Sequence, residues 1–215
     1  MIKVSPPGRH GYGALVTSVD TTLAAVEGAK TVIAVVNRYV PRSFGDSFIH
    51  MSKIDIFVEN DTPLIEEHFA EPNEVEKAIG RNCASLIEDG ACLQMGIGSI
   101  PNAVLSQLTG HKNLGVHTEM FADGVLPLVE SGVINGANKK INRGKIVSTF
   151  LMGSQKVYDF IDDTPGVLMT DVGYTHDPFI ISHNPKVTAL NSALPVALPG
   201  HIRADSPGHK CYSAV

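Results

Sequence analysis

The alternation of buried strands with helical segments is the feature that most constrains the fold. Residues 31–37, "TVIAVVN", form a continuous apolar run rich in β-branched residues, which is typical of a parallel strand buried on both faces. Residues 91–96, 114–118, 146–153 and 166–172 read as further strands, with helical segments between them. This order predicts an α/β fold with a mostly parallel sheet flanked by helices.

Length and composition narrow the class of protein. A chain of 215 residues suits one large α/β domain or two unequal lobes, and 43% hydrophobic with 18% charged residues is typical of a globular chain. The net charge is −5 without any basic run, so nucleic acid and membranes are not expected partners. No apolar stretch reaches the roughly 18 residues of a transmembrane helix. Three widely spaced cysteines, Cys83, Cys92 and Cys211, form no CxxC and favour a reducing cytoplasm.

A long helix is predicted to follow an acidic, proline-interrupted stretch at residues 61–74, where we place the boundary between two lobes. Asn73 is the expected N-cap, with Glu76 completing a capping box, and Gly90 the expected end. The residues expected on its buried face share a helical spacing: Val75, Ala78, Ile79, Cys83, Leu86 and Ile87.

The segment "MGIGSIPNAV", residues 95–104, joins a predicted strand to a helix expected to open at Pro101. Backbone N–H groups at such a helix start favour anions, and Gly96 and Gly98 would let a ligand approach closely. The segment is neither a Walker A motif nor a full dinucleotide fingerprint. A phosphate-binding loop and a plain strand–helix turn both remain open.

Glu119, in "GVHTEMFADGV", is a carboxylate at the end of another predicted strand. Ligand sites in open α/β sheets lie at the carboxyl ends of strands, so the loops after residues 96 and 118 are expected to face one cleft. Glu119 is then a candidate nucleophile, general base or metal ligand, and a cap or a lysine partner is the plainer alternative. His117, two residues earlier, is expected on the same face of the strand.

Other polar groups give weaker signals. One histidine beside one glutamate is no metal site, and no HExxH or clustered ligand pattern occurs, so no metal is expected. The remaining histidines read as loop or surface residues: His10, His50, His68, His111, His176, His183, His201 and His209.

Several motifs in one order resemble the acetyl-CoA hydrolase/transferase family over essentially the whole chain. They include "SPPGRHGYGALVTSVD", "PRSFGDSFIHMSKID", "MGIGSIPNAVLSQL", "LGVHTEMFADGVLPLVESGVI" and "DPFIISHNP". The resemblance is nearest to CoA-transferases of the 4-hydroxybutyrate and butyrate:acetate type. It implies two CoA-transferase-like (NagB/RpiA-like) lobes truncated at both ends: residues 1–65, a remnant of the N-terminal lobe, and residues 66–215, an incomplete C-terminal lobe.

The resemblance also implies a mechanism. The family's glutamate matches Glu119 and attacks an acyl-CoA thioester, giving a mixed anhydride and then a glutamyl-CoA thioester. The family's CoA-contacting loop matches Gly96, Ile97, Gly98, Ser99 and Ile100. With CoA as the expected ligand, five cations are expected either to contact its phosphates or to be ordinary solvated charges: Lys112, Lys139, Lys140, Arg143 and Lys145. Acyl-CoA is therefore an expected substrate, with a short-chain carboxylate as acceptor and no permanently bound cofactor. An acyl-CoA hydrolase and an inactive CoA-binding fragment or subunit are the alternatives. A cytoplasmic homo-oligomer, or complementing chain segments, is the expected assembly.

Overall fold

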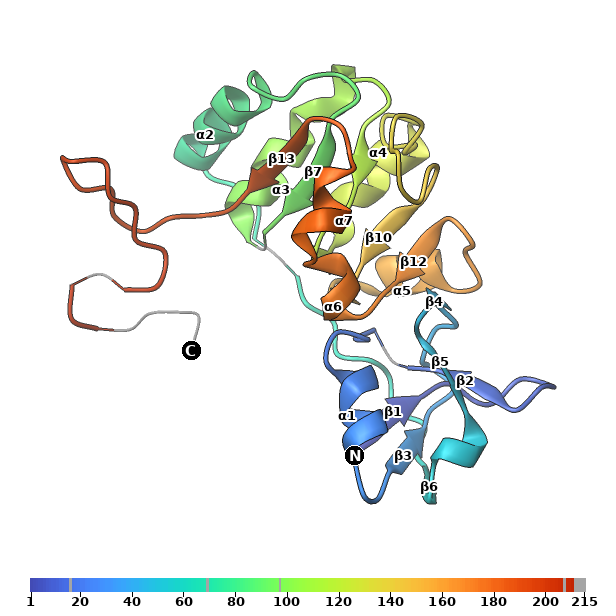
Figure 1. Cartoon of the computed structure of the whole chain (residues 1–215). Coiled ribbons are helices and arrows are strands. Elements are labelled where there is room, and N and C mark those ends of the chain that lie inside the picture. The colour runs from blue at the N-terminus through green and yellow to red at the C-terminus, as the bar shows by residue number, and fades with distance from the viewer. Residues whose placement is uncertain (16, 69, 97, 207, 211–215) are drawn as a thin grey trace.

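The computed structural model describes residues 1–210 apart from 16, 69, 97 and 207, and its larger part is a parallel sheet between two layers of helices (Figure 1). An isolated bridge between His117 and Val147 joins two three-stranded sheets into one array of parallel strands. Its spatial order is β13 (Val187–Leu190), β7 (Cys92–Met95), β8 (Gly115–Val116), β10 (Ile146–Ser148), β12 (Val167–Met169) and β4 (Phe44–Gly45). The predicted α/β fold with a mostly parallel sheet is confirmed.

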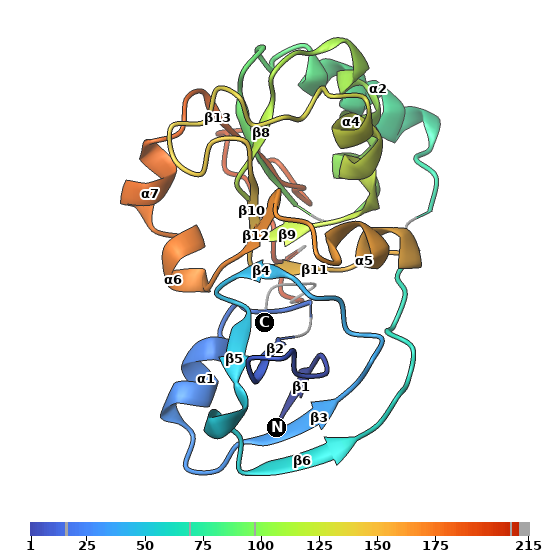
Figure 2. The same ribbon diagram turned by 90° about the vertical axis from the view of Figure 1, so that its right-hand side faces the viewer.

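Helices cover both faces of this sheet, as Figure 2 shows. On one side lie α2 (Glu74–Ala84), α3 (Ser99–Ser106), α4 (Leu126–Glu130) and α5 (Gln155–Ile161). On the other lie the short helices α6 (Val172–Thr175) and α7 (Pro178–Ser182). The core between them is apolar, with Leu93, Val116 and Phe121 fully buried. Three 3-10 turns complete the helices: Met51–Lys53, Leu108–Gly110 and Asp123–Val125.

The smaller, N-terminal part has its own three-stranded parallel sheet in the order β1 (Ile2–Val4), β3 (Ile33–Val36) and β6 (Ile56–Glu59). Helix α1 (Thr22–Gly28) and the antiparallel pair β2 (Tyr12–Ala14) and β5 (Phe48–His50) lie beside it. Strands β1 and β2 are only three residues long, and the Pro- and Gly-rich residues 5–11 between them form neither helix nor strand.

The two parts share backbone contacts. Strand β4 comes from the N-terminal part of the sequence but pairs with β12 of the large sheet, and Ser18 bridges Phe150. The connecting segment, residues 60–73, is irregular, and its Glu67 N–H bonds the carbonyl of Gly153 at 3.0 Å. The division at residues 65 and 66 stays a prediction.

Helix α2 begins as predicted and ends early. The capping box of Asn73 and Glu76 is present, but the helix stops at Ala84, six residues before Gly90. The predicted buried face is confirmed only in part: Ile87 is buried and Cys83 packs against the core, but Val75 and Leu86 are 69% and 81% exposed. Gly80 and Ala84 are buried as well. Small residues face α3 because the two helices approach closely: a Cβ on Gly80 would lie 2.6 Å from the Ala103 carbonyl oxygen. Because small residues make this contact, no periodic pattern of large apolar residues in the sequence indicates it.

Candidate active site

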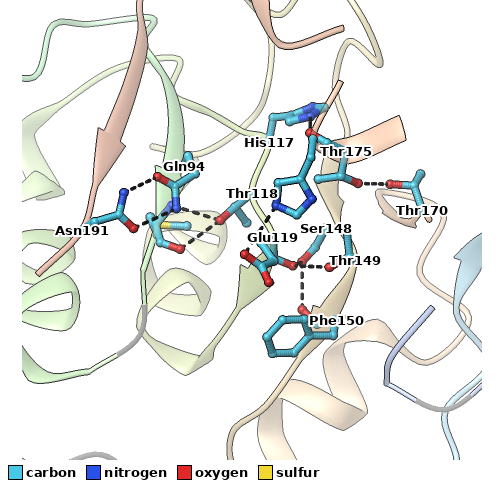
Figure 3. A network of polar contacts seen from close by, with 12 residues as sticks. Gln94, His117, Thr118, Glu119, Ser148, Thr149, Phe150, Thr170, Thr175 and Asn191 are labelled. Atoms are coloured by element: carbon cyan, nitrogen blue, oxygen red, sulfur yellow. Dashed lines mark hydrogen bonds and ion pairs between the residues drawn. The ribbon is translucent and has the colours of Figure 1, made fainter. Parts of the chain in front are cut away.

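Glu119 lies where a parallel strand pair is interrupted. The β8–β10 ladder pairs His117 with Val147, breaks, and resumes as β9 (Met120–Phe121) beside β11 (Phe150–Leu151). The Glu119 carbonyl oxygen lies in this break with four donors around it: Ser148 Oγ at 2.7 Å, Thr149 N at 2.9 Å, Thr149 Oγ1 at 3.0 Å and Phe150 N at 3.1 Å (Figure 3). The backbone that carries the carboxylate is therefore firmly placed.

The Glu119 carboxylate opens onto a cavity of about 400 Å³. Residues from β7, the Glu119 segment, α6, α7 and β13 line it, among them Gln94, His117, Thr175, His176, Ile181 and Asn184. One carboxylate oxygen, Oε2, lies 3.4 Å from His176 Nε2. The Glu119 side chain is 55% exposed, so water reaches its carboxylate.

His117 lies on the cavity wall beside Glu119, as the strand spacing predicted. Its Nε2 lies 2.8 Å from the carbonyl oxygen of Thr175, which only accepts, so Nε2 carries the proton. Its buried Nδ1 has no partner among the described residues. Burial lowers the pKa of His117, and the charges of Lys139 and His176 lower it further. The hydrogen bond to Thr175 acts in the opposite direction and raises it. His117 is thus a neutral, fixed donor to the segment that precedes His176.

The glycine loop follows the neighbouring strand, β7. Thr118 Oγ1 lies 3.0 Å from the Met95 N–H and 3.1 Å from the Met95 carbonyl oxygen, so the ends of β7 and β8 are tied together. Gly98, with a φ of 112°, precedes α3, and a Cβ there would meet nothing within 4 Å. Gly96, Gly98, Ser99 and Ile100 form this turn, and Ile97 lies outside the described residues.

The glycine loop and the Glu119 cavity are adjacent and distinct. Gln94 lines the cavity two residues before Gly96, but the loop residues do not line it. Helix α3 begins at Ser99, two residues before the predicted Pro101, and Ser99 Oγ bonds Glu76 Oε1 of α2. The N-terminus of α3 has no side-chain cap.

Lys139 contradicts its expected role. It is only 3% exposed, and Nζ donates to the carbonyl oxygens of Val116 and Lys145, both at 2.8 Å. Burial lowers its pKa to about 8 and raises that of the neighbouring Cys92 to about 11. Because its ammonium is buried and bonded to two carbonyl oxygens, Lys139 neither contacts a CoA phosphate nor acts as a solvated charge.

Two residues of the cavity escaped the sequence reasoning. His176 was predicted as a loop or surface residue, and it follows α6 directly against Glu119. Asn184 is 6% exposed, lines the cavity, and has neither Nδ2 nor Oδ1 bonded among the described residues. Both lie more than 50 positions after Glu119 in the sequence, so no local spacing links them to it.

No three His, Cys, Asp or Glu side chains in the described part of the chain are grouped to hold a metal ion. Within the same residues, no helix combines the length and apolarity needed to cross a membrane.

Comparison with known proteins of similar sequence and fold defines the class of this protein. Family models of the acetyl-CoA hydrolase/transferase N-terminal and C-terminal domains match residues 1–66 and 153–215. The chain therefore belongs to the acetyl-CoA hydrolase/transferase family.

Several of the similar proteins are named as CoA-transferases. The chain is 50% identical to the 4-hydroxybutyrate coenzyme A transferase of Clostridium kluyveri over 215 residues, which are 100% of this chain and 50% of the relative. Among solved structures, RipA from Yersinia pestis matches with a TM-score of 0.91 and 38% identity over 94% of this chain and 47% of its own. The 4-hydroxybutyrate CoA-transferase of Porphyromonas gingivalis matches with a TM-score of 0.85 and 43% identity, over 89% and 49%. The chain thus spans about half the length of these relatives.

Proposed function

We propose that this chain carries the nucleophile of a CoA-transferase, which moves CoA between an acyl-CoA and a short-chain carboxylate. The observation that carries the proposal is Glu119, a carboxylate on a fixed backbone, open to a cavity between adjacent strand ends. The names of the relatives support the same reaction class.

In the proposed reaction, the Glu119 carboxylate attacks the thioester carbonyl carbon and expels the CoA thiolate, leaving an acyl-glutamyl anhydride. The thiolate then attacks Cδ of Glu119, expels the acyl group as a carboxylate, and forms a glutamyl-CoA thioester. An incoming carboxylate reverses both steps. The proposed CoA contact is the turn that contains Gly96, Gly98, Ser99 and Ile100. It leads into a helix N-terminus without a side-chain cap, which favours anionic groups. Ile97 belongs to the same proposed contact but lies outside the described residues.

An isotope-exchange assay tests this proposal. Labelled acetate and unlabelled acyl-CoA are incubated with the protein, and labelled acetyl-CoA is measured. Glu119→Gln, which keeps the shape of the side chain, is expected to lower the exchange rate on the order of a thousandfold or more, because an amide is no nucleophile here. Glu130→Gln, at an exposed carboxylate on α4, is the matched control and should retain exchange. Equal exchange by the Glu119 variant and the wild type would contradict the proposal.

The exposure of Glu119 supports a second candidate, acyl-CoA hydrolysis. Its side chain is 55% exposed, so water reaches the position of the proposed thioester. A hydrolase releases free CoA when no carboxylate is added, whereas a transferase needs the acceptor. Thiol release measured with and without acetate distinguishes the two.

A further inference from the structure

A second cavity, of about 440 Å³, lies in the smaller, N-terminal part of the molecule beside strands β2 and β5 (Figure 1). Its lining comes from the loop that follows β1, from the segment that follows β3, and from β5. Ligand sites in open α/β sheets gather where the strands end on their carboxyl side. None of the described lining residues belongs to the Glu119 cavity, and they are Gly8, Arg9, His10, Tyr12, Arg42 and Phe48.

The guanidinium of Arg42 is fixed on one edge and open on the other. Its Nε lies 3.2 Å from Asp163 Oδ1, and its Cζ lies 5.0 Å from the centre of the Phe48 ring. Its Nη1 lies close to Gly8, where an added Cβ would approach it to 2.9 Å. Within the described residues, neither Nη1 nor Nη2 has a hydrogen-bond acceptor. A guanidinium that is oriented in this way and keeps free N–H groups is suited to bind a carboxylate or a phosphate.

Arg9 brings a second guanidinium to the same cavity. Its Nε donates to His10 Nε2 at 3.0 Å, so the neutral imidazole carries its proton on Nδ1. Backbone hydrogen bonds fix the loop itself, from the Gly8 N–H to the Tyr12 carbonyl oxygen at 2.8 Å and from the Gly11 N–H to the Gly8 carbonyl oxygen at 2.9 Å. No carboxylate occurs among the described lining residues, so the cavity presents positive charge.

Aromatic rings form the rest of the lining. Phe48 lies under the Arg42 guanidinium and packs edge-on against Phe44, with ring centres 6.0 Å apart. Tyr12 packs edge-on against His50, with ring centres 4.9 Å apart. A cavity with apolar walls and a few placed polar groups is typical of a small-molecule site. The ligand that matches both features carries its negative charge on an apolar ring.

We propose that this cavity binds an aromatic anion, whose carboxylate or phosphate lies between the guanidiniums of Arg9 and Arg42 and whose ring packs against Phe48. The site is independent of the reaction at Glu119. Arg9 belongs to the smaller part of the molecule, whereas the Arg42 backbone N–H donates to Asp162 Oδ1 at 2.7 Å, directly after α5. The bound anion therefore links the two parts and stabilises the folded chain.

Calorimetric titration of the whole chain tests the proposal with benzoate, adenosine monophosphate and inorganic phosphate as probes. We expect one ring-bearing anion to bind at a single site about tenfold or more tighter than inorganic phosphate, because the ring adds apolar contact. Binding should weaken as salt is added. Tighter binding of benzoate assigns an aryl carboxylate, and tighter binding of adenosine monophosphate assigns a nucleotide phosphate. Inorganic phosphate binding as tightly as both, or no binding at all, would overturn the proposal.

Variants locate the bound anion. Arg9→Gln and Arg42→Gln should each weaken binding about tenfold or more, since each removes charge-assisted hydrogen bonds. Asp163→Asn should instead tighten binding severalfold, because its carboxylate no longer competes for Arg42, and asparagine tolerates the φ of 48° at this position. This gain keeps the test valid if Arg42→Gln fails to fold. Unchanged binding in the Arg9 and Asp163 variants would place the anion elsewhere and refute the site.

Arg38→Gln is the matched control. Arg38 makes the same two kinds of contact outside the cavity, with its Nε 3.3 Å from Asp61 Oδ2 and its Cζ 5.5 Å from the centre of the Tyr39 ring. Its variant should bind the anion as the wild type does, and an equal loss of affinity would show a general charge effect and contradict the site. Glu119→Gln should also bind normally, so a failure of the proposed transferase reaction leaves this proposal standing.

Discussion

At the residue scale, Lys139 shows how this fold buries a charge near the candidate active site. Its ammonium donates hydrogen bonds to the carbonyl oxygens of Val116, three residues before Glu119, and of Lys145. Hydrogen bonds to two carbonyls offset part of the desolvation cost, and no ion pair to Lys139 occurs in the described part of the chain. The result is an unusual lysine whose protonation is coupled to folding.

This coupling predicts a pH dependence of stability. Burial lowers the pKa of Lys139 from 10.5 in the unfolded chain to about 8, so between these values only the unfolded state binds the proton. The free energy of unfolding should therefore rise with pH across this window, by on the order of 3 kcal/mol from this residue. Cys92 acts in the opposite direction at higher pH, because burial raises its pKa from 9.0 to about 11.

Denaturant titrations from pH 7 to pH 10 on the wild type and Lys139→Met compare the pH dependence of stability with and without the buried lysine, and both proteins keep Cys92. We expect the wild type to gain stability relative to the variant as the pH rises through about 8. Lys140→Met, at the exposed neighbouring lysine, serves as the control and should run parallel to the wild type. Parallel curves for Lys139→Met would show that its ammonium is not desolvated.

At the scale of elements, the contact between α2 and α3 depends on a missing side chain. Gly80→Ala adds a Cβ that would lie 2.6 Å from the Ala103 carbonyl oxygen, and backbone cannot move aside cheaply. We expect the free energy of unfolding to fall by about 1–3 kcal/mol, despite the higher helix propensity of alanine. Gly28→Ala, at the end of α1 in open space, should be neutral or slightly stabilising. Equal stability of the two variants, measured by denaturation, would refute close α2–α3 packing.

The sequence predicted those elements whose signals are local. The strand of residues 31–37 and the capping box of Asn73 are confirmed because apolar runs and caps depend on near neighbours. The predicted end of α2 was wrong, and its buried face was right only in part, since close contact with α3 places Gly80 at the interface. Likewise, Glu119 and His117 were found from one strand pattern, whereas His176 reaches the cavity only through the folding of α6 over the sheet.

At the scale of the whole molecule, the structure places an exposed strand at the edge of the N-terminal sheet. Ile56, Phe57 and Val58 of β6 are 48%, 49% and 44% exposed, so apolar side chains on both faces of this strand meet solvent. Exposed apolar edge strands favour association, which is consistent with the expected oligomer, although that assembly stays a prediction. The Glu119 cavity, by contrast, is formed within the larger part of the chain.

The central claim is that Glu119 becomes covalently attached to CoA. The direct measurement is incubation with acyl-CoA alone, reduction with borohydride, and mass spectrometry of the tryptic peptide of residues 113–139. Borohydride reduces a thioester and leaves a carboxylate intact, so we expect the Glu119 carboxyl to appear as an alcohol. Glu130 in the same peptide should stay unchanged and serves as the internal control. A folded protein whose Glu119 remains an intact carboxylate after this treatment would contradict the account.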